Sequence, residues 1–294
     1  MSAQKIILGI LAFVVLSIWL VTLPLTILGC LLLSPSIILF TSVSLVLTLY
    51  LQTTYLDVLY EGRWVHRCVS AIPFRSWFRN FVVQDARQQK TTPVLYSIFP
   101  HGKFCFGPML GIHFDTKENT KFAVAPILFY IPIFGLILYY VHCIPASRHH
   151  IRQALRGGWS VILSTEGIPG IICSEKKRTV YYTKRWGVFR IARDTPTPMV
   201  VVWTEGEYDT YDRRSYPLWS LRVWLAHSMQ LLVTFPFLWG ERVFGVPTFL
   251  PKSSCTLVVK ISEEIDIERV KKGKERVKNV LLNMVDLSEP ISII

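Results

Sequence analysis

A histidine just after a short apolar run is the residue best suited to proton transfer in this chain. Residues 94–98 predict a β-strand, and Pro100 ends it because proline cannot donate a ladder hydrogen bond. His101 follows, and Gly102 allows a sharp turn. An imidazole has an unperturbed pKa of about 6.5 and can therefore be a neutral base near pH 7. We predict that His101 is a general base; the alternative is a polar turn residue.

Two glutamates follow other predicted strands in the same way. Glu166 comes after a strand predicted over residues 159–164, and Glu205 comes after one predicted over residues 199–204. Strands that alternate with helices predict an α/β fold with a mostly parallel sheet flanked by helices. Sites in such sheets lie at the carboxyl ends of strands. We therefore expect His101, Glu166 and Glu205 at one edge of the sheet.

The other elements follow from apolar periodicity and from capping residues. Helices are predicted over residues 148–156, 186–193, 218–233 and 263–285, a further strand over 255–261, and a loop over 166–170. Residues 122–141 are apolar throughout, but Pro126, Pro132 and Gly135 interrupt them. This pattern favours a bent helical element at the membrane surface that lines an acyl or acceptor passage; a true membrane span is the alternative.

The N-terminal fifty residues contain a single charged side chain and predict a membrane hairpin. The chain has 294 residues and is 51% hydrophobic, which is more apolar than an ordinary soluble domain. Apolar runs at 6–33 and 37–51 flank a Ser-Pro-Ser turn, and a spanning helix needs about 20 residues. We predict a transmembrane helical hairpin at 1–55, an amphipathic interfacial linker at 56–92 and a catalytic domain at 93–294. One span plus a buried helix is the alternative.

Basic residues exceed acidic ones, with a formal net charge of +12. Such an excess suits nucleic acid, anionic lipid or a phosphorylated small molecule, and the apolar N-terminus argues against nucleic acid. Arg148, Arg152 and Arg156 stand four apart on a predicted helix, and Lys176-Lys177-Arg178 with Lys184-Arg185 form a second cluster. These clusters either hold a phosphate or form a solvated basic surface.

The chain offers a base but no well-placed nucleophile. It has no G-x-S-x-G motif, which argues against an α/β-hydrolase. It also lacks H-E-x-x-H and paired C-x-x-C spacings, so we expect no metal and no other cofactor. These features indicate direct transfer of an activated acyl group, with acyl-CoA as co-substrate. His101 would take the proton from an acceptor hydroxyl, and backbone amides near Gly102 or Gly167 would hold the oxyanion.

The segment Phe99-Pro100-His101-Gly102 resembles the x-Pro-His-Gly signature of the diacylglycerol acyltransferase type 2 family. That family also includes monoacylglycerol and wax-alcohol acyltransferases. The similarity runs from Pro93 to Ile265. Its further blocks are Cys143 to Arg148, Trp159 to Gly167, Arg185 to Val188, Val200 to Glu207, and Phe235 to Phe237 with Gly240 and Arg242.

Four positions depart from the family pattern. Glu166 replaces the first glycine of a pair, and Gly170 stands where the family has a glutamate. Trp186 replaces a lysine, and Lys260 replaces a late glycine. Glu166 also resembles the Pro-Glu-Gly loop of the wider glycerolipid acyltransferase superfamily, whose H-x-x-x-x-D motif is missing because the fifth residue after the histidine is Phe106. The chain is therefore identified as a divergent member.

The resemblance implies a membrane-bound O-acyltransferase with His101 as its catalytic residue. The acceptor would be a neutral lipid, first of all diacylglycerol, which would become triacylglycerol. Acyl-CoA, this acceptor and the membrane would be the partners, with a homodimer left open. The location would be the endoplasmic reticulum membrane or the lipid droplet, with the catalytic domain cytosolic. The expected substrate-binding residues are Pro100, Gly102, Ser147, Arg148, Glu166, Gly167, Arg185, Glu205 and Glu207.

The sequence is also compatible with other functions. A monoacylglycerol, wax-alcohol or lysophospholipid acyltransferase would use the same chemistry on a different acceptor. For a lysophospholipid, Arg148 or Arg185 would bind the acceptor phosphate. A lipid-binding membrane protein without catalytic activity is an alternative from a different class, which the altered glycine pair and the missing lysine favour.

Overall fold

The structure is a computed structural model in which part of the chain is described. The described residues are 66, 69–88, 92–115, 119–130, 134–173, 179–180, 182, 186–212, 219–228, 240–243, 246–248, 250–285 and 292–293. The predicted hairpin at 1–55 and the predicted substrate-binding residue Arg185 lie outside them. Within this described part, no helix combines the length and the apolar character needed to cross a membrane.

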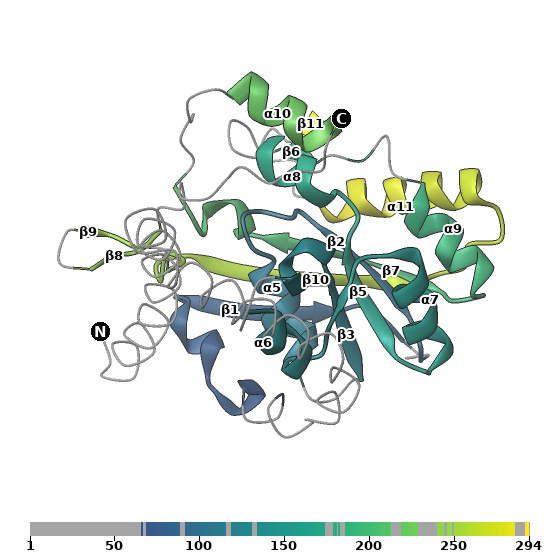
Figure 1. Ribbon diagram of the computed structural model, residues 1–294, viewed down its shortest axis with the longest axis horizontal. Helices are drawn as coiled ribbons and strands as arrows, with labels where there is room; N and C mark the ends of the chain where they lie inside the picture. The colour runs from purple at the N-terminus through teal and green to yellow at the C-terminus, as the bar shows by residue number, and fades with distance from the viewer. Residues whose placement is uncertain are drawn as a thin grey trace, which may run out of the picture.

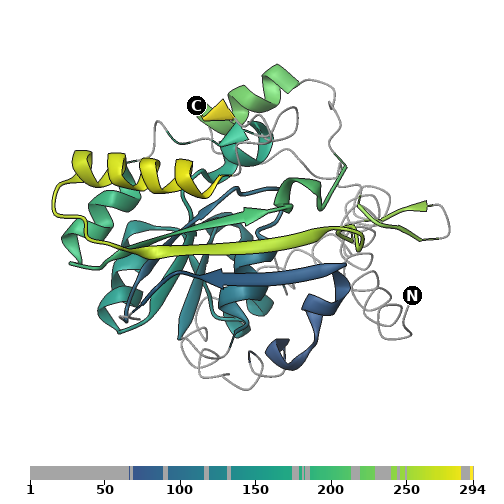
Figure 2. The same ribbon diagram turned by 180° about the vertical axis from the view of Figure 1, so that it is seen from behind.

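A seven-stranded sheet forms the centre of the molecule (Figure 1). In spatial order its strands are β1 (Asn80–Asp85), β10 (Thr256–Ile265), β7 (Met199–Glu205), β2 (Leu95–Phe99), β5 (Ser160–Ser164), β3 (Thr120–Val124) and β4 (Cys143–Pro145). The strands from β7 to β4 run parallel. β10 runs antiparallel to β7, and β1 runs parallel to β10, beside which it lies in Figure 2. The predicted mostly parallel α/β sheet is confirmed.

Helices cover both faces of this sheet. On one face lie α7 (Arg148–Arg156), α9 (Gly187–Asp194) and α11 (Val270–Met284). On the other lie α5 (Phe106–Pro108), the π-helix η2 (Met109–His113), the 3-10 helix η3 (Pro126–Tyr130) and α6 (Phe134–Tyr140). Because both faces of the sheet are covered, the sequence of a central strand is apolar throughout and does not alternate between apolar and polar residues.

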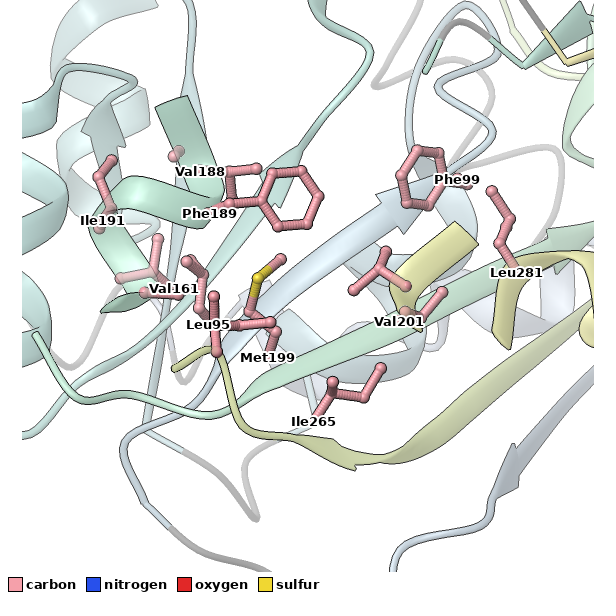
Figure 3. Packing of buried hydrophobic residues seen from close by; sticks show 14 of the residues in the cluster. Leu95, Phe99, Val161, Val188, Phe189, Ile191, Met199, Val201, Ile265 and Leu281 are labelled. Atoms are coloured by element: carbon pink, nitrogen blue, oxygen red, sulfur yellow. The ribbon is translucent and has the colours of Figure 1, made fainter. Parts of the chain in front are cut away.

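Strand β2 illustrates this burial, since all five of its residues are buried. Leu95 and Phe99 pack into the core beneath α9 and α11, together with Phe189 and Leu281 (Figure 3). Tyr96 and Ile98 point into the opposite core. The strand that carries His101 is therefore fixed from both sides.

The remaining elements are short. They are η1 (Phe74–Trp77), α8 (Gly167–Cys173), η4 (Glu207–Asp209) and α10 (Trp219–Ser228), with the two-stranded pairs β6 (Thr179–Val180) with β11 (Ser292–Ile293) and β8 (Arg242–Val243) with β9 (Val246–Pro247). α10 packs against α8 in Figure 1. Of the predicted apolar helix 218–233, residues 219–228 are helical and the rest is outside the described part.

The prediction of a bent helical element over residues 122–141 is wrong for the first part of that segment. Residues 120–124 form the sheet strand β3, and helical structure begins only at Pro126. The error arises because a parallel strand buried on both faces has no alternation, so its apolar run resembles a buried helix.

Two further expectations are corrected. Residues 167–173 form a helix where a loop was predicted, and Pro169 fits there because the first helical turn has no amide partner to lose. Residues 80–85, within the predicted interfacial linker, form the edge strand β1. The sheet therefore begins before Pro93.

Candidate active site

His101 lies two residues beyond the end of β2, between the neighbouring strands β5 and β7. The preceding peptide bond, Phe99–Pro100, is cis, and Pro100 is buried. Gly102 then takes a left-handed conformation with φ +58°. A Cβ at this glycine would lie 2.9 Å from Cγ of Glu207. A glycine is therefore required here by the backbone conformation and by the close approach of Glu207.

Glu166 holds the main chain of this turn. Its side chain is buried, with the residue 1% exposed, and its Oε2 accepts a hydrogen bond of 2.5 Å from the amide of His101. Glu166 lies just beyond β5, and Gly167 follows with φ +61° as the first residue of α8. Two of the predicted site residues, His101 and Glu166, are thus in contact.

Glu207 supports the same turn from the other side. Strand β7 ends at Glu205, and Gly206 turns the chain with φ +79°. The fully buried carboxyl group of Glu207 accepts hydrogen bonds of 2.9 Å from the amides of Phe106 and Gly107. Burial raises the pKa of Glu207 to about 8, although the two amide donors oppose this shift.

The imidazole of His101 is neutral at physiological pH. Burial lowers its pKa to about 4, against hydrogen bonds with the backbone of His101 and Gly102. Its Nδ1 is 3.6 Å from Sγ of Cys105. Burial, together with the charges of Glu207 and Glu166, raises the pKa of this thiol well above its usual range, so Cys105 stays protonated. The turn therefore presents a neutral base and no activated thiol.

Glu205, predicted to share this site, has a different partner. Its side chain forms an ion pair with Lys260 of β10, and the Lys260 ammonium also donates to the carbonyl of Met284 at 3.3 Å. Glu205 thus links β7 to β10 and the end of α11. The structure brings Glu207, two residues later, to the His101 turn instead.

Ser147 and Arg148 also lie apart from the turn. The Ser147 hydroxyl caps α7 by accepting from the amide of His150 at 3.3 Å, as predicted for this helix. An Nη2–Oδ2 contact of 2.9 Å joins Arg148 to Asp194 of α9, and Arg152 pairs with the same carboxylate. Strand β4, which precedes Ser147, is three strands from β2, roughly 14 Å away.

Sequence reasoning missed the main-chain donors at the start of α5. The amides of Phe106 and Gly107 bind Glu207, and a backbone amide leaves no signature in a residue type. Gly107 is a partial signal, because a Cβ there would lie 2.3 Å from Cγ2 of Thr204 on β7. Among the described residues, no group of three or more histidines, cysteines or acidic residues could hold a metal ion.

A separate pocket of about 430 Å³ lies between η1 and η2. It is lined by residues 70–76 with Leu110, Phe114 and Asp115. Arg75 is one of the lining residues, and its Nε donates a hydrogen bond of 2.9 Å to the carbonyl of Leu110. None of the predicted site residues lines this pocket, so the candidate active site is defined by the strand ends.

A family model described as diacylglycerol acyltransferase matches residues 31–285. A search of curated protein sequences gave no significant match. Among solved structures, the chain is similar to the 1-acyl-sn-glycerophosphate (LPA) acyltransferase PlsC from Thermotoga maritima, with a TM-score of 0.45 and 17% sequence identity. That alignment covers 83% of this chain and 97% of the other.

Proposed function

Because this chain belongs to the diacylglycerol acyltransferase family, and is thereby an acyl-CoA-dependent O-acyltransferase of lipid biosynthesis, we propose that it acylates diacylglycerol with His101 as general base. The observation that carries this proposal is the placement of His101. His101 lies in the turn that follows the central strand β2, and the buried side chains of Glu166 and Glu207 hold this turn from two sides.

The proposed reaction needs one base and no covalent enzyme intermediate. The neutral imidazole of His101 takes the proton of the acceptor hydroxyl while that oxygen attacks the thioester carbonyl of acyl-CoA. The tetrahedral intermediate then collapses, the carbon–sulfur bond breaks and the coenzyme A thiolate leaves. The imidazolium of His101 returns its proton to that sulfur. The low pKa of His101, about 4, keeps the ring in its basic form before the reaction.

The oxyanion requires a donor that is not already engaged. The amide of His101 donates to Glu166, and those of Phe106 and Gly107 donate to Glu207. The amides of Gly102 and Gly167 are therefore the candidates. Both residues have positive φ values, which turn the amides that flank them away from the usual strand direction.

A neutral acceptor fits better than a phosphorylated one. The phosphate alternative depended on Arg148 or Arg185, and Arg185 is outside the described residues. Arg148 and Arg152 both pair with Asp194, so this basic cluster already holds a carboxylate. A phosphate bound there would compete with Asp194 for these guanidinium groups.

The proposed setting is the endoplasmic reticulum membrane or the lipid droplet, with the catalytic domain on the cytosolic side. The apolar N-terminal fifty residues and a water-insoluble acceptor support this setting. Microscopy of the tagged full-length protein with markers for both compartments tests it. Exclusive localisation to any other membrane would overturn it.

The test of catalysis compares two histidine substitutions in full-length protein. His101→Ala is assayed with labelled acyl-CoA and diacylglycerol beside His149→Ala, which makes the same change at an exposed position of α7. We expect His101→Ala to lose activity by at least ~100-fold and His149→Ala to keep it. Transfer retained by His101→Ala would overturn the mechanism.

An acceptor screen with the unmodified protein tests the substrate. We expect diacylglycerol to be preferred over monoacylglycerol, a long-chain alcohol and a lysophospholipid. A preference for the lysophospholipid would overturn the neutral-acceptor proposal and would favour Arg148 or Arg185 as the residue that binds the acceptor phosphate. A preference for monoacylglycerol or the alcohol would keep the mechanism and change the acceptor.

A further inference from the structure

Glu166 and Gly170 occupy a single space in the structure. Gly170 is buried on α8, one helical turn after Glu166. A Cβ at Gly170 would lie 2.4 Å from Cβ, 3.1 Å from Cδ and 3.2 Å from Oε2 of Glu166. Cβ is not the movable end of the glutamate side chain, so a substituent at 170 would displace Glu166 as a whole. The side chain of Glu166 therefore fills the volume that a side chain at 170 would take.

This carboxylate fixes the point at which the chain enters the His101 turn. Oε2 of Glu166 accepts from the amide of His101 itself, at 2.5 Å. The contact ties the end of β5 to the end of β2. A buried carboxylate keeps its place only when it has such partners, and the amide it holds would otherwise be left without an acceptor.

The reach of a glutamate makes the two positions interchangeable. The point now held by Oε2 of Glu166 lies 3.2 Å from a Cβ built at Gly170. A glutamate spans that separation, because its carboxylate oxygens are three bonds from Cβ. The same oxygen position can therefore be supplied from residue 170 when residue 166 has no side chain.

We propose that Glu166 is the positioning residue of the His101 turn, and that its carboxylate can be delivered equally from residue 170. This inference rests on the proposed role of His101. It also gives one physical account of two departures from the family pattern, the glutamate at 166 and the glycine at 170. They are a single exchange across one helical turn, which retains the carboxylate.

The test is a double-mutant cycle in the full-length protein, with acyl transfer to diacylglycerol as the first measurement. Glu166→Gly removes the carboxylate, and Gly170→Glu forces two side chains into one space. We expect each single variant to lose at least ~10-fold in kcat, since small displacements of a catalytic group have large effects. The combined variant E166G/G170E should recover to within about 3-fold of the unmodified protein.

A matched control separates the acceptor oxygen from the packing. The variant E166G/G170Q has the shape of E166G/G170E without the charge. We expect it to fold equally well and to restore less kcat, because a carboxylate is the stronger acceptor for the His101 amide. A positioning role also predicts that kcat falls more than KM for acyl-CoA rises. Equal recovery by both double variants would overturn the carboxylate's role.

A second cycle tests the shared space without any reaction. Gly170→Ala should lower the melting temperature of the protein that carries Glu166, and should leave it unchanged or raise it in the Glu166→Gly background. Additive effects would overturn the shared space. If the unmodified protein transferred no acyl group, the proposed function would fail, and this cycle would still decide the packing. If E166G/G170E melted normally but stayed as inactive as the single variants, the interchange would be wrong.

Discussion

His113 is a buried histidine and His101 a partly buried one. They lie at opposite edges of the same sheet, where the amino ends and the carboxyl ends of its strands meet. Burial lowers the pKa of His101 to about 4 and that of His113 to about 3. His101 follows the carboxyl end of β2. His113 ends η2 near the amino ends of β3 and β4, where its contacts are Thr120 and Val141. A lowered pKa alone therefore does not distinguish the proposed catalytic histidine from a structural one.

His113 and His101 differ in which of their atoms the surrounding residues bind: the ring nitrogens of His113, and the backbone amide of His101. The ring of His113 is held at both nitrogens, with Nδ1 3.0 Å from Oγ1 of Thr120 and Nε2 2.6 Å from the carbonyl of Val141. His66 and His142 pack beside it, and their rings stack on each other at 4.4 Å. At His101 the buried carboxylate of Glu166 holds the backbone amide. The ring of His113 is therefore held as part of the core, whereas His101, the proposed base, is held through its backbone amide.

The largest expected effect comes from removing each histidine in turn. His101→Ala should lose kcat by ~10²–10⁴-fold, the usual contribution of a general base. His113→Ala should keep kcat per folded molecule within about 3-fold, because its contacts are structural. Its free energy of unfolding should fall by about 1–3 kcal/mol, since the buried hydroxyl of Thr120 and the partly buried carbonyl of Val141 lose their contacts. Activity is normalised to the folded fraction from thermal melts. A folded but inactive His113→Ala would remove the distinction between the two edges.

The second effect compares two glycines, one at each edge. Gly102 has φ +58° and Gly158, just before β5, has φ +77°. A Cβ at Gly158 would meet nothing within 4 Å, whereas one at Gly102 would lie 2.9 Å from Glu207. Gly158→Ala should lose about 1–2 kcal/mol from its left-handed backbone alone. Gly102→Ala should lose about 1–3 kcal/mol more, and kcat with it.

The matched backbone makes this pair decisive. Urea unfolding gives the free energies, and the acyl transfer assay gives kcat. Equal losses of stability at the two positions, with kcat intact in Gly102→Ala, would mean that the packing of Glu207 against the turn has no bearing on the site.

The sequence predicted the strands that hold the site because those strands are buried on both faces. β2, β5 and β7 are short apolar runs that end at turn residues, and each lies within one residue of its predicted bounds. The same property hid β3, whose apolar run continues into η3 and α6 without a change of pattern. β1 was missed because its arginine- and aromatic-rich surroundings resemble a membrane interface.

Within the site, the sequence placed glutamates at the right strand ends and could not say which of them turns inward. Glu205 and Glu207 are two residues apart, and Gly206 between them has φ +79°. That left-handed residue directs Glu205 to Lys260 and Glu207 to the His101 turn. A sequence shows a glycine but not the sign of its φ, so only the structure separates these two carboxylates.

The third effect is a pH dependence of stability to which Glu207, at one edge, and His113, at the other, contribute with opposite signs. The pKa of Glu207 is raised from 4.5 to about 8, so the folded state binds more protons than the unfolded state between these values. Stability from this group is lost as the pH rises through that window. The pKa of His113 is lowered from 6.5 to about 3, so stability from it is lost as the pH falls from 6.5 towards 3.

Substitutions show which residue causes the loss of stability at high pH (the alkaline limb) and which causes the loss at low pH (the acid limb). In melting temperatures measured from pH 4 to 9, Glu207→Gln should flatten the alkaline limb and His113→Asn should reduce the acid limb. His101 adds to the acid limb, since its pKa is lowered from 6.5 to about 4. An unchanged alkaline limb in Glu207→Gln would contradict burial as the cause of the raised pKa.

The smallest effect separates the two neighbouring carboxylates of the carboxyl edge. Glu205 is in a half-exposed ion pair, with the side chains of Glu205 and Lys260 33% and 28% exposed. Such pairs contribute about 0–1 kcal/mol, so Glu205→Ala should change stability little and leave kcat unaltered. Glu207→Ala removes the acceptor of two buried amides and should lower both, although less than His101→Ala lowers kcat. Both variants replace a glutamate by alanine, and only Glu207 contacts the His101 turn. The difference in kcat between them therefore shows how much this contact contributes. A loss in Glu205→Ala as large as that in Glu207→Ala would mean that the strand end, and not the inward carboxylate, supports the histidine.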